Sequence, residues 1–282
     1  MTYFLIADSG STKTEWALIT KQQVLLRFQT KGINPYFLNE KQIAHLLSTE
    51  CLPYLSKYLN LLQAVYFYGA GCSTKENKLK LIHSIRNVFQ IEEVHIWHDI
   101  LGAARATCKK NKGIVGILGT GSNACVYSGL TIINTAVSYG YLFGDYGSGA
   151  HIGKTFVQHY CDNTLPKELK IEFEKAGYNA EKILEGVYQN PMPSRFLASI
   201  FPFVIKHKHH SFVKELIENS LKKYFEIQLL PIVTEKYDLH FVGSVATILK
   251  EELTNIAKQY NLRLVNVMKH PMDGLIEYHQ GK

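Results

Sequence analysis

Apolar residues in the first hundred positions form short runs rich in β-branched and aromatic side chains, separated by polar or glycine breaks and by longer amphipathic stretches. The short runs are typical of strands, and apolar residues at helical spacing behind Asn or Thr are typical of helices. Asn39 and Thr74 are therefore expected to cap helices. The pattern predicts strands at 3–7, 15–19, 24–28, 64–68 and 94–97 and helices at about 39–47, 52–61 and 74–89.

The order strand, Gly/Ser/Thr-rich turn, strand, strand occurs a second time roughly 110 residues later, which indicates a structural repeat. Strands that alternate with helices in two copies favour an α/β architecture with mostly parallel sheets. In such folds, ligands bind at the carboxyl ends of strands. The second copy predicts strands at 113–118, 124–127, 131–136, 240–242 and 262–267, a mostly helical stretch at 152–230, a helix at 245–260, and a last helix after Pro271.

The composition is that of a globular protein large enough for two domains, with 282 residues, 46% hydrophobic and 20% charged. The four-residue apolar start runs straight into Asp8, so no export signal is expected, and no run is long enough to span a membrane. Five scattered cysteines do not resemble a disulfide framework. We therefore expect a cytoplasmic protein without a membrane partner.

The formal net charge of +7 is compatible with an anionic substrate. Its basic clusters, 109–112 and the His-rich run 206–210, lack the interleaved aromatic residues of nucleic-acid modules. We expect exposed loops and helix ends there and no nucleic-acid partner, with a metal site in the histidine run as a minor alternative.

The segment Asp8-Ser9-Gly10-Ser11-Thr12-Lys13-Thr14 follows the first predicted strand directly. Small residues let backbone N–H groups approach a phosphate, and the hydroxyls and Lys13 add donors. Asp8 could hold the Mg²⁺ that accompanies ATP. The spacing matches neither the Walker loop nor the dinucleotide fingerprint, so this turn alone could be merely structural.

Three further glycine-rich segments also follow strands or precede helices. Leu118-Gly119-Thr120-Gly121-Ser122-Asn123 offers the same phosphate chemistry in the second copy. Segment 140–149 carries one carboxylate, Asp145, among four glycines, and segment 241–245 suits an adenosine or a phosphate at a helix start. Each could be an ordinary turn, but two matching phosphate loops are less easily explained in that way.

Asp99 stands at the end of a predicted strand, in His98-Asp99, before Gly102. A carboxylate in this place can act as general base on an acceptor hydroxyl that attacks a terminal phosphate. The alternative is that Asp99 caps the following helix.

The order of these motifs, Asp-x-Gly-x-Thr, Gly-Thr-Gly-Ser, Gly-Asp-x-Gly-Ser and a late Val-Gly-Ser, resembles the acetate kinase, sugar kinase, heat-shock and actin superfamily. Within it the chain is similar to the N-acetylglucosamine kinases and the related BadF-BadG-BcrA-BcrD ATPase family over nearly its whole length. The resemblance implies two actin-like (ribonuclease H-like) lobes, each a mixed sheet flanked by helices, with a cleft between them. We expect the lobes to comprise residues 1–110 plus 271–282 and residues 111–270.

The resemblance also implies roles for individual residues in phosphorylating an amino sugar, most simply N-acetylglucosamine at its 6-hydroxyl, with ATP and Mg²⁺. Asp99 matches the catalytic base and Asp8 the metal ligand. Residues that match nucleotide-binding positions are Gly10, Ser11, Thr12, Lys13, Thr120, Gly121, Gly243 and Ser244. Residues that match positions near the sugar are Asn34, Ser122, Asn123 and Asp145. ATP and the sugar are the expected partners, and a homodimer is left open.

The sequence departs from the family pattern in two ways, and two alternative functions remain open. The chain is shorter than animal N-acetylglucosamine kinases, and Tyr146 stands where a glutamate is common, which leaves the acceptor sugar open. One alternative is an ATP-driven activator of a 2-hydroxyacyl-CoA dehydratase, whose iron–sulfur cluster would need ligands such as Cys125 and Cys161. The other is a nucleotide-dependent regulatory protein without a sugar acceptor, although such a protein needs neither Asp99 nor Asn34.

Overall fold

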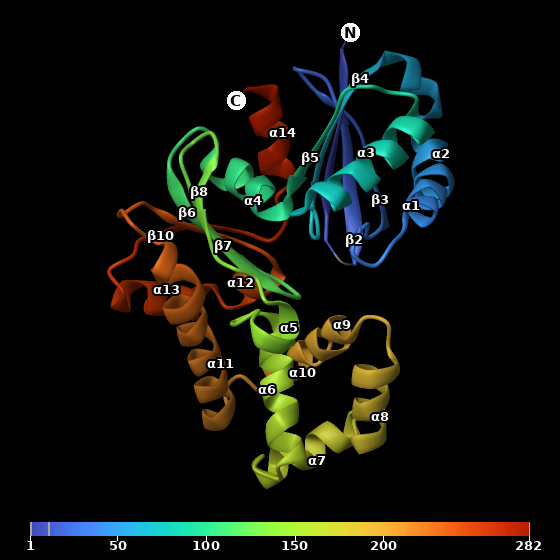
Figure 1. The fold of residues 1–282 in the computed structure, drawn as a ribbon. Helices are drawn as coiled ribbons and strands as arrows, with labels where there is room; N and C mark the ends of the chain where they lie inside the picture. Colours follow the sequence, from blue (N-terminus) through green and yellow to red (C-terminus); the bar gives the residue numbers. More distant parts are fainter. Residues whose placement is uncertain (1, 11, 282) are drawn as a thin grey trace. The chain divides into compact units, whose positions relative to one another are not determined.

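The computed structural model describes residues 2–10 and 12–281, which divide into two compact units (Figure 1). The first unit comprises Met1–Asn111, Ser128–Thr131 and His270–Lys282, and the second comprises Lys112–Tyr127 and Ile132–Lys269. Among the described residues, no helix has both the length and the apolar character that a membrane span requires.

The first unit contains a five-stranded sheet in the order β3-β2-β1-β4-β5. Strands β1 to β3 form an antiparallel meander, whereas β4 and β5 run parallel to β1. The backbone N–H of Thr20 donates to the Gln23 carbonyl at 2.9 Å, which closes the hairpin turn between β2 and β3. The strands are β1 (Tyr3–Ser9), β2 (Lys13–Ile19), β3 (Val24–Lys31), β4 (Leu62–Gly69) and β5 (Val94–His98).

Helices cover both faces of this sheet (Figure 1). On one face, Val65 and Phe67 of β4 join a core with residues of α1 and α3. On the other face, Tyr66 stacks on His279 of the last helix, α14, and the Tyr68 hydroxyl lies 2.8 Å from His279 Nε2. The helical segments of this unit are α1 (Glu40–Leu46), a π-helical turn (Leu47–Cys51), α2 (Leu52–Leu55), a 3₁₀ segment (Ser56–Leu61), α3 (Lys75–Phe89), α4 (Asp99–Cys108) and α14 (Met272–Gln280).

The second unit repeats this arrangement in a five-stranded sheet of order β10-β9-β6-β7-β8. β6, β7 and β8 are antiparallel neighbours, and β9 and β10 run parallel to β6. The fold class of two mixed sheets flanked by helices is confirmed. The expectation of mostly parallel sheets is wrong, because two of the four strand pairs in each sheet are antiparallel. The strands are β6 (Gly113–Leu118), β7 (Ser122–Tyr127), β8 (Ile132–Thr135), β9 (Leu239–Val242) and β10 (Leu264–Met268).

The stretch between β8 and β9 is mostly helical, as the pattern predicted for residues 152–230. The predicted helix 245–260 is instead two helices that meet at Leu249, with φ −101° and ψ 25°. The helical segments of this unit are α5 (Gly140–Phe143), α6 (Gly149–Cys161), α7 (Lys167–Lys175), α8 (Ala180–Leu184), a π-helical turn (Glu185–Gln189), α9 (Pro193–Ala198), α10 (Phe201–Lys206), α11 (Ser211–Lys223), a π-helical segment (Tyr224–Leu229), a 3₁₀ turn (Leu230–Ile232), α12 (Ser244–Ile248) and α13 (Lys250–Gln259).

The predicted caps of the first unit lie where the sequence placed them. Asn39 caps α1 and forms a capping box with Gln42, whose backbone N–H donates to Asn39 Oδ1 at 2.9 Å. The Thr74 hydroxyl accepts the N–H of Asn77 at the start of α3 at 3.2 Å. These local signals succeed because a cap needs only contacts within one turn.

Candidate active site

The parallel strands of the first sheet bring three strand ends to one edge. In the register of the sheet, Ser9 of β1 lies opposite Gly69 of β4, and Gly69 lies opposite His98 of β5. The N–H of Ala70 donates to the Ser9 carbonyl at 2.9 Å, which joins the loop after β4 to the end of β1. Residues that directly precede or follow these ends, Asp8 and Asp99, are therefore gathered at this edge.

The first predicted phosphate loop is a tight turn between β1 and β2. Its Gly10 N–H donates to the Lys13 carbonyl at 3.0 Å, and the Thr12 carbonyl accepts the N–H of Gly32 at 3.1 Å. Gly10 and Thr12 are exposed and Lys13 is partly exposed, so these groups are accessible to a ligand. Ser11, the fourth predicted residue of this loop, lies outside the described residues.

Asn34 is held beside this turn by two hydroxyl residues that sequence reasoning missed. Ser9 Oγ and Thr14 Oγ1 are 2.7 Å apart, and Ser9 Oγ both donates to the Ile33 carbonyl and accepts the Ile33 N–H, each at 3.0 Å. The Asn34 Oδ1 atom accepts the N–H of Tyr36 at 3.0 Å. The amide NH₂ of Asn34 is therefore the part of this buried side chain left to donate to a ligand.

Asp99 is the first residue of α4, and the N-cap of that helix is His98. The Asp99 carboxylate nevertheless accepts the N–H of Ile100 at 2.8 Å, so it does satisfy a donor of the first turn. Asp99 is 25% exposed, which leaves it accessible. The two interpretations of Asp99, helix start and reactive carboxylate, are therefore compatible.

Asp8 has an unusual electrostatic environment. Burial, together with the negative charges of Asp99 and Glu15, raises the pKa of Asp8 to about 7, against a smaller opposing effect of Lys13. Oxygen ligands and crowded negative charge are what a hard divalent cation such as Mg²⁺ prefers. The Asp8 carboxylate thus has the chemistry that the predicted metal would need.

In the second unit, the carboxyl ends of β6, β9 and β10 lie side by side. Val242 of β9 is opposite both Ile117 of β6 and Met268 of β10. Gly243 then adopts φ +127°, where a Cβ would lie 2.1 Å from the Leu118 carbonyl oxygen. Only glycine fits this close approach. Gly243 thus adjoins the loop after β6. Ser244, the next residue of the Val-Gly-Ser motif, is exposed at the start of α12.

That loop is bonded to the start of α6. The Gly149 N–H donates to the Gly119 carbonyl at 2.9 Å, and the Ala150 N–H donates to the Thr120 carbonyl at 3.1 Å. Thr120 and Gly121 remain partly exposed. The second predicted phosphate loop is therefore a fixed, accessible turn.

Asp145 lies against this loop. Its Oδ1 accepts the Ser122 N–H at 3.2 Å, and a Cβ on Gly121 would be 3.0 Å from its Oδ2. Asp145 is 8% exposed and adopts φ +52°, an uncommon backbone conformation for a residue other than glycine. Such a conformation at a buried carboxylate is a feature of functional loops.

The side chains of Ser122 and Asn123 face the protein interior in this structure. Ser122 Oγ donates to Gln228 Oε1 at 2.7 Å. Asn123 Oδ1 accepts the N–H of Ala124, and the Asn123 carbonyl accepts the Tyr224 hydroxyl at 2.9 Å. Gln228 and Tyr224 lie in a helical stretch with no glycine-rich or strand-end signal, so nothing in the sequence marked them.

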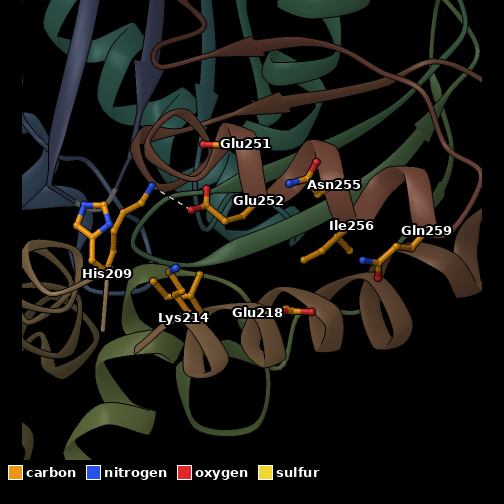
Figure 2. Close-up of a pocket in the computed structure, with 10 residues that line it drawn as sticks. His209, Lys214, Glu218, Glu251, Glu252, Asn255, Ile256 and Gln259 are labelled. Atoms are coloured by element: carbon orange, nitrogen blue, oxygen red, sulfur yellow. Dashed lines mark ion pairs between the residues drawn. The ribbon is translucent and has the colours of Figure 1, made fainter. Parts of the chain in front are cut away.

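A separate pocket of about 510 Å³ lies between α11 and α13 (Figure 2). Charged and amide side chains line it, including Lys214 and Glu218 on α11 and Glu251 and Asn255 on α13. None of the predicted site residues contributes to its lining.

The cysteines and the histidine run show ordinary environments. Cys125 is buried in β7 and Cys161 is exposed at the end of α6. In the histidine run, His210 Nε2 contacts Glu168 Oε1 at 2.9 Å, and Lys208 pairs with Glu252 at 3.0 Å. Within residues 2–10 and 12–281, no group of three or more potential ligands for a metal ion is found.

Comparison with solved structures identifies the relatives of the chain. A protein from Porphyromonas gingivalis, described as a putative N-acetylglucosamine kinase, is 37% identical, with a TM-score of 0.93 and 99% of each chain covered. A second protein so described, from Chromobacterium violaceum, is 17% identical with a TM-score of 0.69 and 99% of each chain covered. A ROK family glucokinase from Streptomyces griseus, in complex with glucose and AMPPNP, is 13% identical with a TM-score of 0.58, covering 98% of this chain and 97% of that one.

The two more distant matches, at 17% and 13% identity, show only that the fold is shared. No protein-family model and no curated protein sequence matches the chain. The full-length match at 37% identity is sufficient to establish the family, in agreement with the motif order. This chain belongs to the N-acetylglucosamine kinase family.

Proposed function

We propose that this protein transfers the terminal phosphate of ATP to the 6-hydroxyl of N-acetylglucosamine. The observation that carries the proposal is the pair of carboxylates, Asp8 and Asp99, at one edge of the first sheet, in a chain of this family. The two carboxylates supply two functions that phosphoryl transfer needs, a cation ligand and a base for the acceptor hydroxyl. Asn34 lies at the same edge, where its amide can donate to a sugar hydroxyl or carbonyl.

In this proposal, Asp99 accepts the proton of the acceptor hydroxyl while the hydroxyl oxygen forms a bond to the terminal phosphorus. The bond from that phosphorus to the bridging oxygen breaks, and ADP leaves with the electron pair. Asp8 would hold Mg²⁺, which when bound neutralises phosphate charge. The remaining residues orient the reactants, and orientation provides much of the catalysis in phosphoryl transfer.

The residues of the second unit are proposed to bind the nucleotide and the transferred phosphate. The backbone of Thr120 and Gly121, in the turn after β6, would donate to phosphate oxygens, as Thr12 and the Lys13 side chain would in the turn after β1. Gly10, whose N–H closes that turn, would let a phosphate approach closely because it has no side chain. Gly243 and Ser244 would contact the adenosine. Ser122, Asn123 and Asp145 are proposed to support the sugar end, for which the backbone position of Asp145 is the main structural support.

An ADP-release assay with Mg-ATP tests the proposal. The acceptors are N-acetylglucosamine, glucosamine, N-acetylmannosamine, glucose and water alone. We expect fast release only with N-acetylglucosamine. Release that is equal with every sugar and with water would refute the proposal and favour a nucleotide-dependent regulatory protein. If iron were then found in anaerobically purified protein, the dehydratase activator would become the better hypothesis. A cytoplasmic location and a homodimer remain parts of the same proposal.

A further inference from the structure

His98 and Asp99 form a close side-chain pair at the end of β5. The His98 Nδ1 atom lies 2.5 Å from Asp99 Oδ1, and the two side chains are 28% and 25% exposed. His98 is also the N-cap of α4, so its backbone position is fixed by both a strand and a helix. The contact is therefore partly shielded from water and well anchored.

Two donors converge on one oxygen of the Asp99 carboxylate. Oδ1 accepts the Ile100 N–H at 2.8 Å and lies within hydrogen-bond distance of His98 Nδ1. Over the described part of the chain, Oδ2 has no hydrogen bond. The Ile100 N–H also lies 3.5 Å from His98 Nδ1, but its contact with Asp99 Oδ1 is much shorter. Because an ionised carboxylate oxygen can only accept, we assign the proton of the 2.5 Å contact to His98 Nδ1.

The charges around His98 agree with this assignment. Burial by itself lowers the pKa of His98, but the charge of Asp99 and the hydrogen bond to it outweigh that effect and raise the pKa above its ordinary value. Lys78, on α3, has a smaller lowering effect. Asp99 on α4 and Lys78 on α3 are the charged groups that act on the imidazole.

We propose that His98 is a positioning residue that fixes the Asp99 carboxylate through Oδ1 and leaves Oδ2 to take the proton of the acceptor hydroxyl. This inference rests on the proposed function, since it assigns the reacting atom of the proposed base. The proton moves from the hydroxyl to Oδ2, and His98 keeps its own proton throughout. His98 thus contributes geometry and does not exchange a proton with the substrate.

Three substitutions separate hydrogen bonding from helix capping. In His98→Asn, the side-chain amide can place an N–H where Nδ1 stands. In His98→Asp, the side chain has nearly the same shape as Asn, but its carboxylate can only accept hydrogen bonds. Both Asn and Asp are good N-caps. His98→Ala removes both functions. Steady-state kinetics with N-acetylglucosamine and ATP, together with thermal unfolding, is measured for each variant.

We expect His98→Asn to keep kcat within about threefold of the wild type. His98→Asp and His98→Ala should lower kcat about tenfold or more, because a misplaced base loses much of its catalytic effect. The KM for ATP should change little in all three variants. Wild-type kcat in His98→Asp, or kcat in His98→Asn as low as in His98→Asp, would overturn the inference. This pair decides the question even if His98→Ala does not fold.

An NMR titration of the imidazole in the ligand-free protein separates failure of this inference from failure of the proposed function. The pKa of His98 should fall when Asp99→Asn removes the carboxylate charge. An unchanged pKa would overturn the contact, whatever reaction the protein catalyses. If the titration behaves as expected but the wild type releases no sugar-dependent ADP, the proposed function fails and the base assignment fails with it.

Discussion

At the scale of single residues, position at a strand end was the signal that identified most candidate site residues in the sequence. Asp8, Asp99 and Gly243 stand at or next to strand ends in both the sequence pattern and the structure. The residues that hold the site together carry no such signal. Ser122 and its partner Gln228 are 106 positions apart, so their contact exists only after the chain has folded.

Replacement of Asp99 tests the base. Asp99→Asn keeps the shape of the side chain but removes its basicity, so kcat should fall by about 10²- to 10⁴-fold, the usual contribution of a general base. ATP affinity should remain nearly unchanged, because Asp99 does not belong to the predicted nucleotide loops. Steady-state kinetics and nucleotide binding measure the two effects. Full activity in this variant would remove Asp99 from the base role.

The raised pKa of Asp8 predicts a pH-dependent gain in stability on its replacement. Below the ordinary pKa of 3.8, Asp8 is protonated in both the folded and the unfolded chain. Between pH 3.8 and about 7, the unfolded chain loses this proton while the folded protein keeps it. The free energy of unfolding therefore falls as the pH rises through this range. Above pH 7 the destabilisation by Asp8 stays constant.

Asp8→Asn should therefore raise the Tm of the ligand-free protein at pH 8 and change it much less at pH 4, while reducing activity. Thermal unfolding without Mg²⁺ or nucleotide measures this. Asp162→Asn, at an exposed position, serves as the control and should show no comparable difference between the two pH values. A loss of Tm in Asp8→Asn at pH 8 would contradict the predicted environment.

At the scale of elements, the pattern located most strands and helices but not their directions. β7 is buried along its whole length, because helices and neighbouring strands cover it. A fully buried antiparallel strand and a parallel strand both have continuous apolar sequences, so the sequence could not distinguish the two strand directions. The break at Leu249 was missed for a similar reason, since apolar residues continue at helical spacing through it.

The junction of β6 with β9 offers a matched pair of glycines. Gly243→Ala would put a Cβ 2.1 Å from the Leu118 carbonyl oxygen at φ +127°, whereas a Cβ on Gly119 meets nothing within 4 Å. Gly243→Ala should lose more than about 2 kcal/mol of stability, and Gly119→Ala much less. Urea unfolding of both variants measures this. Equal stability of the two would show that the turn can relax.

At the scale of the whole molecule, the order of the motifs was more informative than any one of them. Each turn could be an ordinary loop, but their sequence along the chain predicted the family that the 37% identical relative establishes. The acceptor is less accessible to such reasoning. In the proposed function it depends on side chains such as Asn34, whose neighbour Ile33 is held by Ser9, 24 positions earlier in the chain.

Ligand binding should stabilise the folded protein in two separable steps. Mg²⁺ with a non-hydrolysable ATP analogue, and N-acetylglucosamine separately, should each raise Tm, since a ligand at 100 times its Kd adds about 2.7 kcal/mol. Asn34→Ala should abolish the shift with the sugar and keep the shift with the nucleotide. Thermal-shift measurements test this, and loss of both shifts would mean that Asn34 supports the fold and not the sugar.

The most direct test of the central claim is to identify the product by ³¹P NMR after incubating the wild type and Asp99→Asn with Mg-ATP and N-acetylglucosamine. We expect a phosphomonoester on the 6-hydroxyl of the sugar, formed by the wild type far faster than by the variant. Conversion of ATP to ADP and free phosphate with no sugar phosphate formed, or equally fast product formation by both proteins, would contradict the proposed function.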